Sequence, residues 1–246
     1  MASPIEIYRT PFLNHPNLQG YWRLNGNFND SSVNGYTLTG SGTPGDVQGI
    51  FGDSNGAKSF ASASSQYAKI ANASCPNLNI TGPQTWIAWV YPTAFNNNGR
   101  IMSKADGTNT ANRHDFYITS SIETPARAVT FQLSGLTTNN SIQTSANVLS
   151  TGKWQFVAAR YDGANISIWV NGEIVAMLPA TGSANSSTAA FWVAAAGFGG
   201  GDTASDLADT YIDEAQVYNT GLSNNEIWQI YNGSASFRSG DFRRWF

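Results

Sequence analysis

The chain has 246 residues and a formal net charge of −3, and 12% of its residues are charged, where soluble domains average about 25%. This low content of charged residues, with its slight acidic excess, excludes the basic surface that a nucleic-acid backbone requires. It also excludes the basic amphipathic helix of a membrane-surface protein. With 8 Trp, 10 Tyr and 13 Phe the chain can fill a large core, and its length fits one large all-β domain.

The termini and the single cysteine carry no targeting or disulfide signal. No apolar run reaches the length of about 18 residues that a transmembrane helix needs, so we expect none. The first residues lack the apolar core of a signal peptide, so we expect no cleavable signal. Cys75 stands alone, which excludes an intramolecular disulfide and favours a buried, unreactive thiol.

The first third of the chain alternates between strand-like segments and polar loops. Pro4, Pro11 and Pro16 oppose helix and central strand, so we expect residues 1–19 to form an N-terminal arm. Strand texture begins at Gly20, and NGNFNDSSVNGYT follows as a polar loop. The segment KSFASASSQYAKI then predicts one or two strands around a turn.

The segment TWIAWVYP, residues 85–92, is the clearest strand. Its even-numbered residues from Trp86 to Val90 face one side, and its odd-numbered residues from Ile87 to Tyr91 face the other. Because both sides are apolar, we expect this strand to be buried between two layers. The strand pattern continues in RIMSK, HDFYITS, AVTFQLS, SIQTS, AFWVAAAGF (190–198) and TYIDEAQVY (210–218).

Residues 161–177, YDGANISIWVNGEIVAM, predict a β-hairpin. Apolar residues recur with a period of two from Ile166 to Val170. Asn171-Gly172 follows and tolerates the positive φ angles of a type I′ turn, after which EIVAM returns as the second strand. An Asp-Gly pair marks an earlier turn after WQFVAARY, so we expect three consecutive strands to form an antiparallel meander.

One helix is expected near the C-terminal end, in LSNNEIWQIYNG. Ser223 followed by Glu226 is the capping-box pattern, in which each side chain satisfies a free backbone N–H at the helix start. Ile227 and Ile230 give an apolar stripe, and Gly233 is placed to end the helix. Many short strands with one brief terminal helix predict an all-β sandwich of two antiparallel sheets with jelly-roll connections.

These segments, in this order, resemble a known family. YWRLNGNFNDSSVNGYTLTG, FASASSQYAKI, TWIAWVYP, WQFVAARYDG…SIWVNG and IDEAQVYNTGLSNNEI are similar to the laminin-G-like, concanavalin A-like lectin/glucanase family. The resemblance covers residues 20–233 and implies a concanavalin A-like jelly-roll β-sandwich. It leaves residues 1–19 as an arm and residues 234–246 as an aromatic, basic C-terminal tail.

The resemblance also bears on catalysis, because the glucanases of this fold carry a Glu-x-Asp-x-x-Glu strand motif whose acids share one face of a cleft. Retaining glycoside hydrolysis needs two carboxyl groups about 5 Å apart. Here Asp213 and Glu214 are adjacent, and regular strand alternation would point them to opposite faces. The sequence contains no Ser-His-Asp pattern, P-loop or dinucleotide motif. We therefore expect no enzyme, with a glycan-cleaving enzyme as the less favoured alternative.

Members of this family often carry one calcium ion, and the resemblance places it between the first polar loop and the late strand. The matching residues are Asp30 in the loop and Asp213 in the strand, and the loop also supplies Asn34 as an oxygen ligand. Calcium takes about six to eight oxygen ligands, and here it would join the first and last strands. The alternative is that Asp30 organises an Asx turn and that Asp213 accepts a hydrogen bond at a strand end.

A neutral sugar is held by aromatic rings that stack on its C–H groups and by amides and hydroxyls that exchange hydrogen bonds. Loops at one end of a sandwich carry function more often than strands do. We expect the loops at 95–99, 108–114 and 199–209 to bind a ligand, with core packing as the alternative for each aromatic ring. The residues expected to contact it are Phe95, Asn97, Arg113, His114, Trp192 and Asp202.

The C-terminal tail combines aromatic rings with arginines, as the anchors of protein–protein contacts do. We expect it to dock onto a second copy of the chain or onto a larger particle; the alternative is that it packs back on its own sandwich. The docking residues would be Phe237, Arg243, Arg244, Trp245 and Phe246.

Together these features predict a lectin-like module that binds glycan without catalysis and is stabilised by calcium. We expect it in a virion or on an extracellular surface, for example as a phage decoration or tail component. Its expected partners are a glycan and, through the terminal arms, further copies of the chain or virion proteins; neither nucleic acid nor membrane is expected. The alternative from another class is a structural interaction module that binds no sugar.

Overall fold

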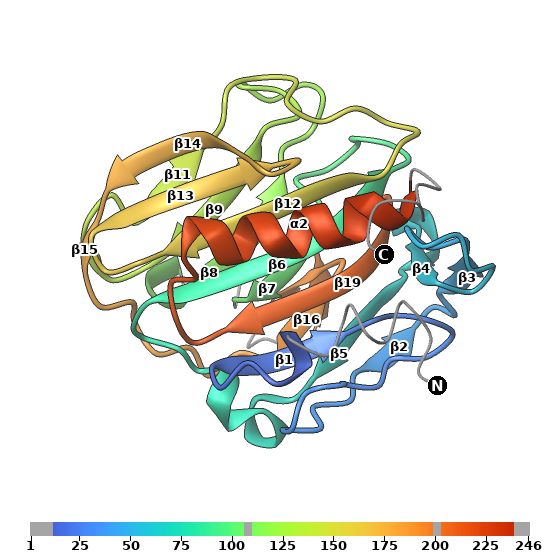
Figure 1. Ribbon diagram of the computed structural model, residues 1–246, viewed down its shortest axis with the longest axis horizontal. Coiled ribbons are helices and arrows are strands. Elements are labelled where there is room, and N and C mark those ends of the chain that lie inside the picture. Colours follow the sequence, from blue (N-terminus) through green and yellow to red (C-terminus); the bar gives the residue numbers. More distant parts are fainter. Residues whose placement is uncertain (1–11, 106–109, 199–202, 239–246) are drawn as a thin grey trace, which may run out of the picture.

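The computed structural model describes residues 12–105, 110–198 and 203–238. They form two large antiparallel sheets that stack on each other, with one long helix lying across the outer face of the first sheet (Figure 1). We call the first the helix-bearing sheet and the second the opposite sheet. The predicted all-β sandwich is therefore confirmed. Within the described residues, no helix has the length and apolar composition needed to cross a membrane.

The helix-bearing sheet has eight strands in the order β14-β13-β12-β6-β19-β4-β3, and β1 pairs with β19 beside this path. Its strands are β1 (Leu18–Trp22), β3 (Gly45–Val47), β4 (Ala57–Phe60), β6 (Gln84–Pro92), β12 (Gln155–Tyr161), β13 (Asn165–Val170), β14 (Glu173–Pro179) and β19 (Thr210–Tyr218). The pairing of β1 with β19 places the first and last strands side by side, as the resemblance implies.

The opposite sheet has seven strands in the order β11-β9-β8-β7-β16-β5-β2. Its strands are β2 (Thr39–Ser41), β5 (Tyr67–Ile70), β7 (Arg100–Lys104), β8 (His114–Ile118), β9 (Val129–Leu133), β11 (Ser141–Gln143) and β16 (Phe191–Val193). Two strand pairs lie apart from both sheets, β10 (Leu136–Thr138) with β15 (Thr181–Gly182) and β17 (Ala196–Phe198) with β18 (Thr203–Ser205). The helical segments are η1 (Ser62–Ser64), η2 (Asn72–Ser74), η3 (Pro76–Leu78), η4 (Thr110–Asn112) and α2 (Asn224–Arg238).

The core between the sheets consists of apolar residues that alternate along the strands. Trp22 of β1 stacks on Phe191 of β16 with ring centroids 4.9 Å apart, so these rings join the two sheets. Trp86 of β6 packs against the same phenyl ring and against Phe131 of β9. The even-numbered residues of β6 from Trp86 to Val90 all belong to this inter-sheet core, as their alternation predicts.

A second apolar cluster lies between the helix-bearing sheet and α2. Ile87 and Trp89 of β6 join Ile227 and Ile230 of the helix in it. The Trp89 indole N–H also donates to Ser234 Oγ of α2 at 3.0 Å, which fixes the helix over the sheet. Because β6 contributes to both clusters, it is buried on both faces, as predicted.

The predicted hairpin and the predicted helix start are both confirmed. β13 and β14 pair across Asn171-Gly172, whose φ angles are 50° and 84°. At the start of α2, Ser223 N–H and Ser223 Oγ each donate to Glu226 Oε2 at 2.7 Å, and Glu226 N–H donates back to Ser223 Oγ at 3.2 Å. These hydrogen bonds from Ser223 lower the pKa of Glu226.

Two expected elements have different bounds. Residues 190–198 form two strands, β16 and β17, because Ala194 adopts a left-handed φ of 65° that turns the chain out of the opposite sheet. The helix does not end at Gly233 but runs through Arg238. Ser234, one residue beyond Gly233, donates its hydroxyl to the Ile230 carbonyl and lies against Trp89. The boundary expected at residue 233 thus falls inside α2, and the division into arm, domain and tail stays a prediction.

Candidate functional site

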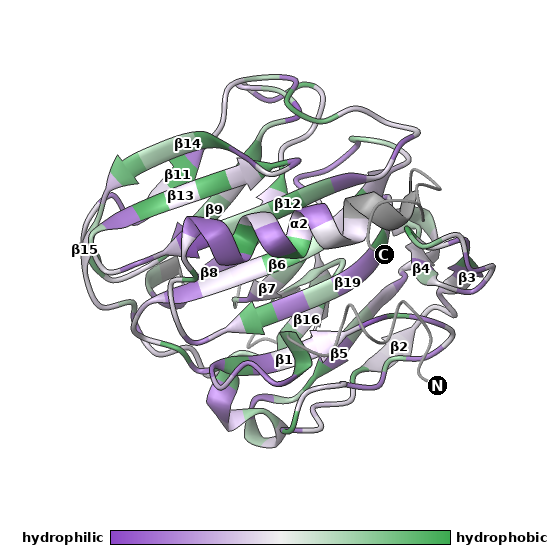
Figure 2. Cartoon of the chain, in the orientation of Figure 1, coloured by the Kyte–Doolittle hydropathy of each residue, from purple (hydrophilic) through white to green (hydrophobic). Residues whose placement is uncertain are grey.

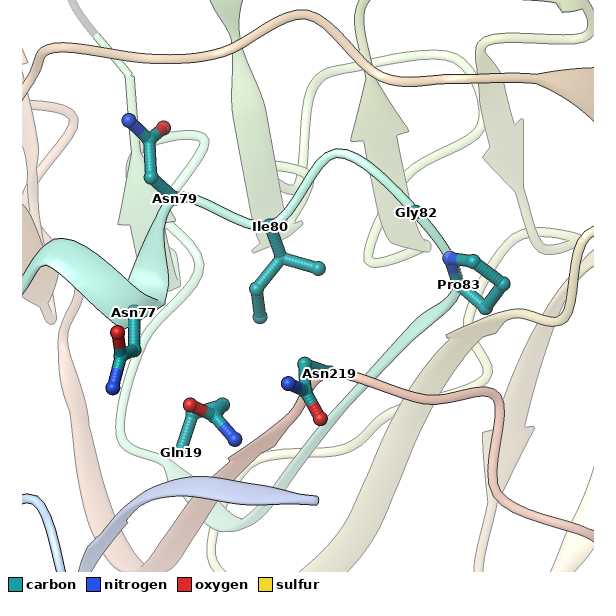
Figure 3. A pocket seen from close by; sticks show the side chains of 7 residues that line it. All are labelled: Gln19, Asn77, Asn79, Ile80, Gly82, Pro83 and Asn219. Atoms are coloured by element: carbon teal, nitrogen blue, oxygen red, sulfur yellow. The ribbon is translucent and has the colours of Figure 1, made fainter.

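A hollow of about 460 Å³ opens where β1 begins and β19 ends (Figure 3). We call it the amide cavity, because four side-chain amides from distant parts of the chain surround it. Its lining residues are Gln19, Asn77, Asn79, Ile80, Gly82, Pro83 and Asn219. None of these described lining residues carries a charge.

A bulge in β1 and the end of β19 place two of the amides. Gln19 lies where the register of β1 against β19 shifts between Leu18 and Gly20. Asn219 directly follows β19, and its backbone N–H donates to the Asn17 carbonyl at 3.0 Å. A bulge of this kind re-aims a side chain relative to a regular strand. The paired first and last strands therefore present both amides at one end of the sandwich.

A tight turn before β6 places the other two amides. Asn77 lies in the 3-10 helix η3, which begins at Pro76, where the fixed φ of proline favours a helical start. Asn79 follows the helix, and its backbone N–H donates back to the Pro76 carbonyl at 3.1 Å. Both residues line the hollow, and the Asn79 amide points away from its centre (Figure 3).

A hydrogen bond at one atom of each side-chain amide holds Asn77 and Asn79 in place. Asn77 Nδ2 donates to Asn34 Oδ1 at 3.1 Å, and Asn79 Oδ1 accepts a hydrogen bond from the Ser187 backbone N–H at 2.8 Å. Among the described residues, nothing hydrogen-bonds to Asn77 Oδ1 or Asn79 Nδ2. One acceptor, on Asn77, and one donor, on Asn79, therefore have no partner within the described protein.

Gln19 and Asn219 add to this set. Gln19 Nε2 donates to the Asn17 carbonyl at 3.2 Å. In the described part of the chain, Gln19 Oε1 and both polar atoms of the Asn219 side chain have no hydrogen-bond partner. The cavity thus offers carbonyl acceptors and amide donors, with no ionisable group. Such a lining suits a neutral molecule rich in hydroxyl groups, because each hydroxyl both donates and accepts a hydrogen bond.

The loop that holds Asp30 adjoins this cavity. Asp30 Oδ1 accepts hydrogen bonds from the backbone N–H groups of Tyr21 and Ser32, each at 2.8 Å. Its Oδ2 accepts from Ser32 Oγ at 2.7 Å and from the Tyr36 N–H at 2.8 Å. The carboxylate therefore acts as the organiser of an Asx turn, which is the alternative that the sequence left open.

The other two predicted calcium residues are also engaged within the protein. Asn34 Nδ2 donates to the Gln19 carbonyl at 3.0 Å, so Asn34 connects the Asp30 loop to the amide cavity. Asp213 Oδ2 accepts from the Ile50 N–H at 2.9 Å. No group of three or more His, Cys, Asp or Glu side chains in the described residues could hold a metal ion. Calcium binding stays a prediction, and it would require backbone and amide oxygens in place of these hydrogen bonds.

The expectation that Asp213 and Glu214 point to opposite faces is wrong. The register of β19 against β6 shifts between Asp213 and Gln216, and Glu214 has a φ of 52°, so a bulge interrupts the alternation. Asp213 accepts from Ile50, and Glu214 accepts from the Tyr21 hydroxyl. Both partners belong to the cluster under α2. The two acids are buried there, 0% and 4% exposed, and do not line an open groove.

Three of the predicted ligand-binding side chains lie inside the protein. Phe95, His114 and Trp192 are buried, so core packing describes them. His114 Nε2 lies 2.8 Å from the Asn185 carbonyl, and burial lowers the His114 pKa. Trp192 lies under the Lys69 ammonium, 4.7 Å from the ring centroid. A ligand contact through these three residues stays a prediction.

Two of the three expected loops do come together. Asn97 Nδ2 lies 3.5 Å from the Leu207 carbonyl, and Asn97 is exposed. Arg113 is partly exposed, with its Nε 3.2 Å from the buried Asp115 carboxylate. Asp202 lies outside the described residues. So do Arg243, Arg244, Trp245 and Phe246 of the tail and the side chain of Phe237, whose backbone belongs to α2.

The amide cavity escaped the sequence analysis because its four amides are spread from residue 19 to residue 219. Asn and Gln are common throughout this chain, so none of them stood out. The available signal was their position beside strand ends: Gln19 and Asn219 flank segments expected to be the first and last strands. Combined with the expected pairing of those strands, this would have placed the two amides together.

A buried lysine near the inter-sheet core is a second polar feature that the sequence did not predict. Lys104 is fully buried, and its ammonium donates to Asn72 Oδ1 at 2.6 Å and to the Ala189 carbonyl at 2.7 Å. Both acceptors are neutral, and burial lowers the Lys104 pKa to about 8, although Cys75 opposes this shift. Lys104 is closed to solvent, so it serves the fold rather than a ligand.

Comparison with known proteins points to one superfamily. The sequence model described as the concanavalin A-like lectin/glucanases superfamily matches residues 62–228, which is more than half of the chain. No curated protein matches the chain in sequence.

Solved structures share the fold at low sequence identity. Domain 4 of AbnA, a GH43 extracellular arabinanase from Geobacillus stearothermophilus, in complex with arabinotriose, is 15% identical with a TM-score of 0.65; the match covers 87% of this chain and 98% of that one. Botulinum neurotoxin type C, whose cell entry depends on two ganglioside molecules, is 12% identical with a TM-score of 0.65; the match covers 92% of this chain and 53% of that one.

The binding domain of botulinum neurotoxin DC, in complex with rat synaptotagmin II, is a further match. It is 12% identical with a TM-score of 0.63, over 89% of this chain and 51% of that one. The chain thus spans about half the length of the neurotoxin chains that it matches. At these identities the likeness shows the fold alone.

Proposed function

We propose a binding function for this chain, which belongs to the concanavalin A-like lectin/glucanases superfamily. It binds a neutral glycan in the amide cavity and does not cleave it. The observation that carries this proposal is the ring of uncharged amide residues that line the cavity, in which Asn77 Oδ1, Gln19 Oε1 and both polar atoms of the Asn219 side chain have no hydrogen-bond partner among the described residues. The cavity volume of about 460 Å³ lies within the usual range for small-molecule sites, roughly 300–1,000 Å³.

The amide chemistry favours sugars over charged ligands. A phosphate or a uronate would require a cationic partner, and the lining contains none. Pro83 is exposed and supplies apolar surface on which the C–H groups of a sugar ring can rest, whereas Ile80 is buried in the inter-sheet core. Each net hydrogen bond contributes about 0.5–1.5 kcal/mol, so a few such bonds support binding in the millimolar to micromolar range that one small cavity allows.

The structural neighbours are consistent with this proposal. The AbnA domain was solved with arabinotriose, and neurotoxin type C interacts with gangliosides. These are properties of those proteins, and we carry sugar binding to this chain as a proposal only. Calcium at Asp30, Asn34 and Asp213 and a location in a virion or on an extracellular surface belong to the same proposal.

The absence of catalysis is part of the proposal. Asp213 and Glu214 are buried beneath α2, where they accept hydrogen bonds from the Ile50 N–H and the Tyr21 hydroxyl. A substrate therefore has no access to them. A retaining glycosidase requires both carboxyl groups beside the scissile bond. Incubation with β-glucans and arabinans followed by product analysis tests this point, and released oligosaccharides that disappear in Asp213→Asn or Glu214→Gln would contradict it.

The second candidate is a structural interaction module without sugar binding. It is favoured by a specific observation, the exposed apolar side chains of β14 and α2, which suit a protein contact. A glycan array on the intact protein separates the two candidates. Binding to no neutral glycan on the array would favour the structural module.

Isosteric variants test the cavity itself. Asn219→Asp and Asn77→Asp keep the shape but replace an amide by a carboxylate, and we expect at least a tenfold loss of glycan affinity, about 1.4 kcal/mol, by isothermal titration calorimetry. The matched control is Asn97→Asp in the other loop cluster, which we expect to leave affinity unchanged. Loss in the control with no loss in the cavity variants would move the site to the loops that the sequence predicted.

A further inference from the structure

A second hollow, with a volume of about 440 Å³, opens between α2 and the β13–β14 hairpin. We call it the helix groove. Its lining comes from the end of β13, the hairpin turn and the start of β14 on one side, and from the first turns of α2 on the other. In Figure 2 the first turn of α2 is hydrophilic, whereas β13 and β14 beside it are largely hydrophobic. The helix groove therefore combines polar and apolar walls.

Contacts within the fold hold this groove open in a fixed shape. Gly172 has a φ of 84°, and a Cβ atom there would lie 2.4 Å from the Tyr231 ring of α2, so the hairpin turn packs directly against the helix. Nearer the helix start, Arg160 Nη1 donates to Asn224 Oδ1 at 2.8 Å and to the Leu222 carbonyl at 2.9 Å. The two walls are thus positioned by the protein itself.

Trp228 supplies an aromatic surface in the groove. It is 49% exposed, whereas the other tryptophans of the described residues are buried or half-buried. Ile174, 39% exposed, adds apolar surface from the hairpin side. An exposed indole in a groove is a surface on which the C–H groups of a sugar ring can stack.

Hydrogen-bonding groups lie within one helical turn of this ring. Asn224 and Asn225 precede Trp228 by four and three residues, a spacing that makes side chains neighbours on a helix surface. Within the described residues, Asn224 Nδ2, both polar atoms of the Asn225 side chain and the Glu173 carboxylate have no hydrogen-bond partner. All three residues are exposed and line the groove. Donors and acceptors therefore accompany the indole.

A buried donor also borders the groove. Trp169 lines it and is only 3% exposed, and among the described residues its indole N–H has no hydrogen-bond partner. A buried donor left unsatisfied costs about 1–3 kcal/mol. An oxygen atom of a molecule in the groove would supply an acceptor that the fold does not.

We propose that the helix groove is a second binding site for a neutral sugar. The ring stacks on Trp228, and its hydroxyl groups hydrogen-bond to Asn224, Asn225 and Glu173. A hydroxyl suits this mixture, because it donates to a carboxylate and accepts from an amide. The groove and the amide cavity share no lining residue, so each site can be disrupted without the other.

The charges around the groove favour a neutral ligand over a charged one. Glu173 is the one charged residue among those that line it, and it would repel an anion. A cation would lie beside the partial positive charge of the helix start. Arg160, which donates to Asn224, is paired with Asp162 at 3.4 Å and is not left to bind an anion.

Tryptophan fluorescence of the full chain tests the proposal. The probes are linear neutral hexasaccharides of glucose, xylose, arabinose, galactose and mannose. We expect at least one of them to bind and to shield the exposed indole from quenching by acrylamide. Trp228→Ala should abolish this shielding and, by isothermal titration calorimetry, weaken binding at the groove at least tenfold, which is about 1.4 kcal/mol. Trp228→Phe keeps an aromatic ring and should lose less.

Matched variants locate the effect. Asn225→Ala should weaken the shielding, whereas Gln229→Ala, on the same helix but outside the groove lining, should leave it unchanged. Asn219→Asp alters the amide cavity and should also leave it unchanged, so failure of one site is distinguished from failure of the other. Thermal unfolding of each variant checks that it is folded.

Three outcomes would overturn the proposal. If no hexasaccharide shields the indole, the groove binds no neutral sugar of this panel. Shielding that persists in Trp228→Ala at unchanged affinity belongs to another surface. A wild-type dimer in sedimentation velocity that becomes a monomer in Trp228→Ala would assign the groove to a second copy of the chain.

Discussion

The two faces of the helix-bearing sheet are built differently. The inner face meets a complete second sheet, and its side chains join one apolar core of rings such as Trp22, Trp86 and Phe191. In the described part of the chain, the outer face meets α2 and the loop residues Leu13, Ile50 and Phe51. Beneath this cover lie the acids Asp213 and Glu214 beside Tyr21.

This difference shows where function can reside in the sandwich. A sheet buries another sheet along its whole width, whereas one helix of 15 residues covers only a band. At the β14 end of the outer face Ile174 and Met177 are exposed, and the ends of strands β1 and β19 carry the amide cavity. The inner face supplies stability, and the outer face and its rim supply surfaces for partners.

The largest expected effect compares two tryptophans. Trp22→Ala should lower the free energy of unfolding by about 3–5 kcal/mol, because it removes a fully buried ring from the inner core and leaves a cavity. Trp228→Ala on the outer face should change it by less than about 0.5 kcal/mol. Urea unfolding followed by circular dichroism measures both. Equal losses of unfolding free energy in the two variants would mean that the two faces of the sheet contribute alike to stability.

The next effect concerns a charge at the edge of the inner core. The folded-state pKa of Lys104 is about 8, below its ordinary 10.5. The unfolded chain therefore binds more protons between these values, and the free energy of unfolding should rise with pH across this window, by on the order of 2–3 kcal/mol. Below pH 8 the burial penalty is fully present.

Lys104→Met should remove this rise, because methionine does not titrate. The measurement is the unfolding free energy of both proteins at pH 7 and pH 10, taken as a difference so that other titrating groups cancel. If the unfolding free energies of the two proteins change with pH in parallel, the pKa of Lys104 is not lowered and the inter-sheet core tolerates its charge.

A smaller effect tests the polar pair of the outer face. The Tyr21 hydroxyl donates to the Glu214 carboxylate, and hydrogen bonds to charged groups contribute about 1.5–3 kcal/mol. Tyr21→Phe should therefore lower stability by about 2 kcal/mol in thermal or urea unfolding. Tyr117→Phe is the control, because among the described residues its hydroxyl has no hydrogen-bond partner. A loss of similar size in the control would contradict the role of the pair.

The smallest effect concerns the start of the helix that covers the outer face. Ser223→Ala removes the capping hydrogen bonds to Glu226 and should lower stability by about 1 kcal/mol. Ser223→Thr keeps a hydroxyl and should lose less. Guanidinium unfolding curves distinguish the two, and identical midpoints would show that packing on Trp89 alone fixes α2.

Local patterns in the sequence predicted most of the fold. The Asn171-Gly172 turn, the two apolar faces of β6 and the Ser223–Glu226 capping box depend on residues close together in the chain, and all three are confirmed. The bulge at Glu214 was not predictable in this way. It depends on how β19 pairs with β6 and β1, which lie far away in sequence.

The candidate site was predicted less well, for the same reason. Asn97 and Arg113 lie at the surface of the expected loop cluster, but His114 and Trp192 are buried by strands and loops from elsewhere in the chain. The four amides of the cavity become neighbours only when β1 and β19 pair. Exposure and proximity depend on such distant contacts, which no short segment encodes.

The sequence by itself determined the class of this protein: alternating apolar strands, polar turns and one capped helix fix an all-β sandwich, because backbone geometry and hydrophobic periodicity are local properties. Only the tertiary structure decided which amides share a hollow, which acids are buried and which apolar side chains stay exposed. Those outcomes depend on long-range packing, where each side chain is covered or left open by residues that the sequence places far away.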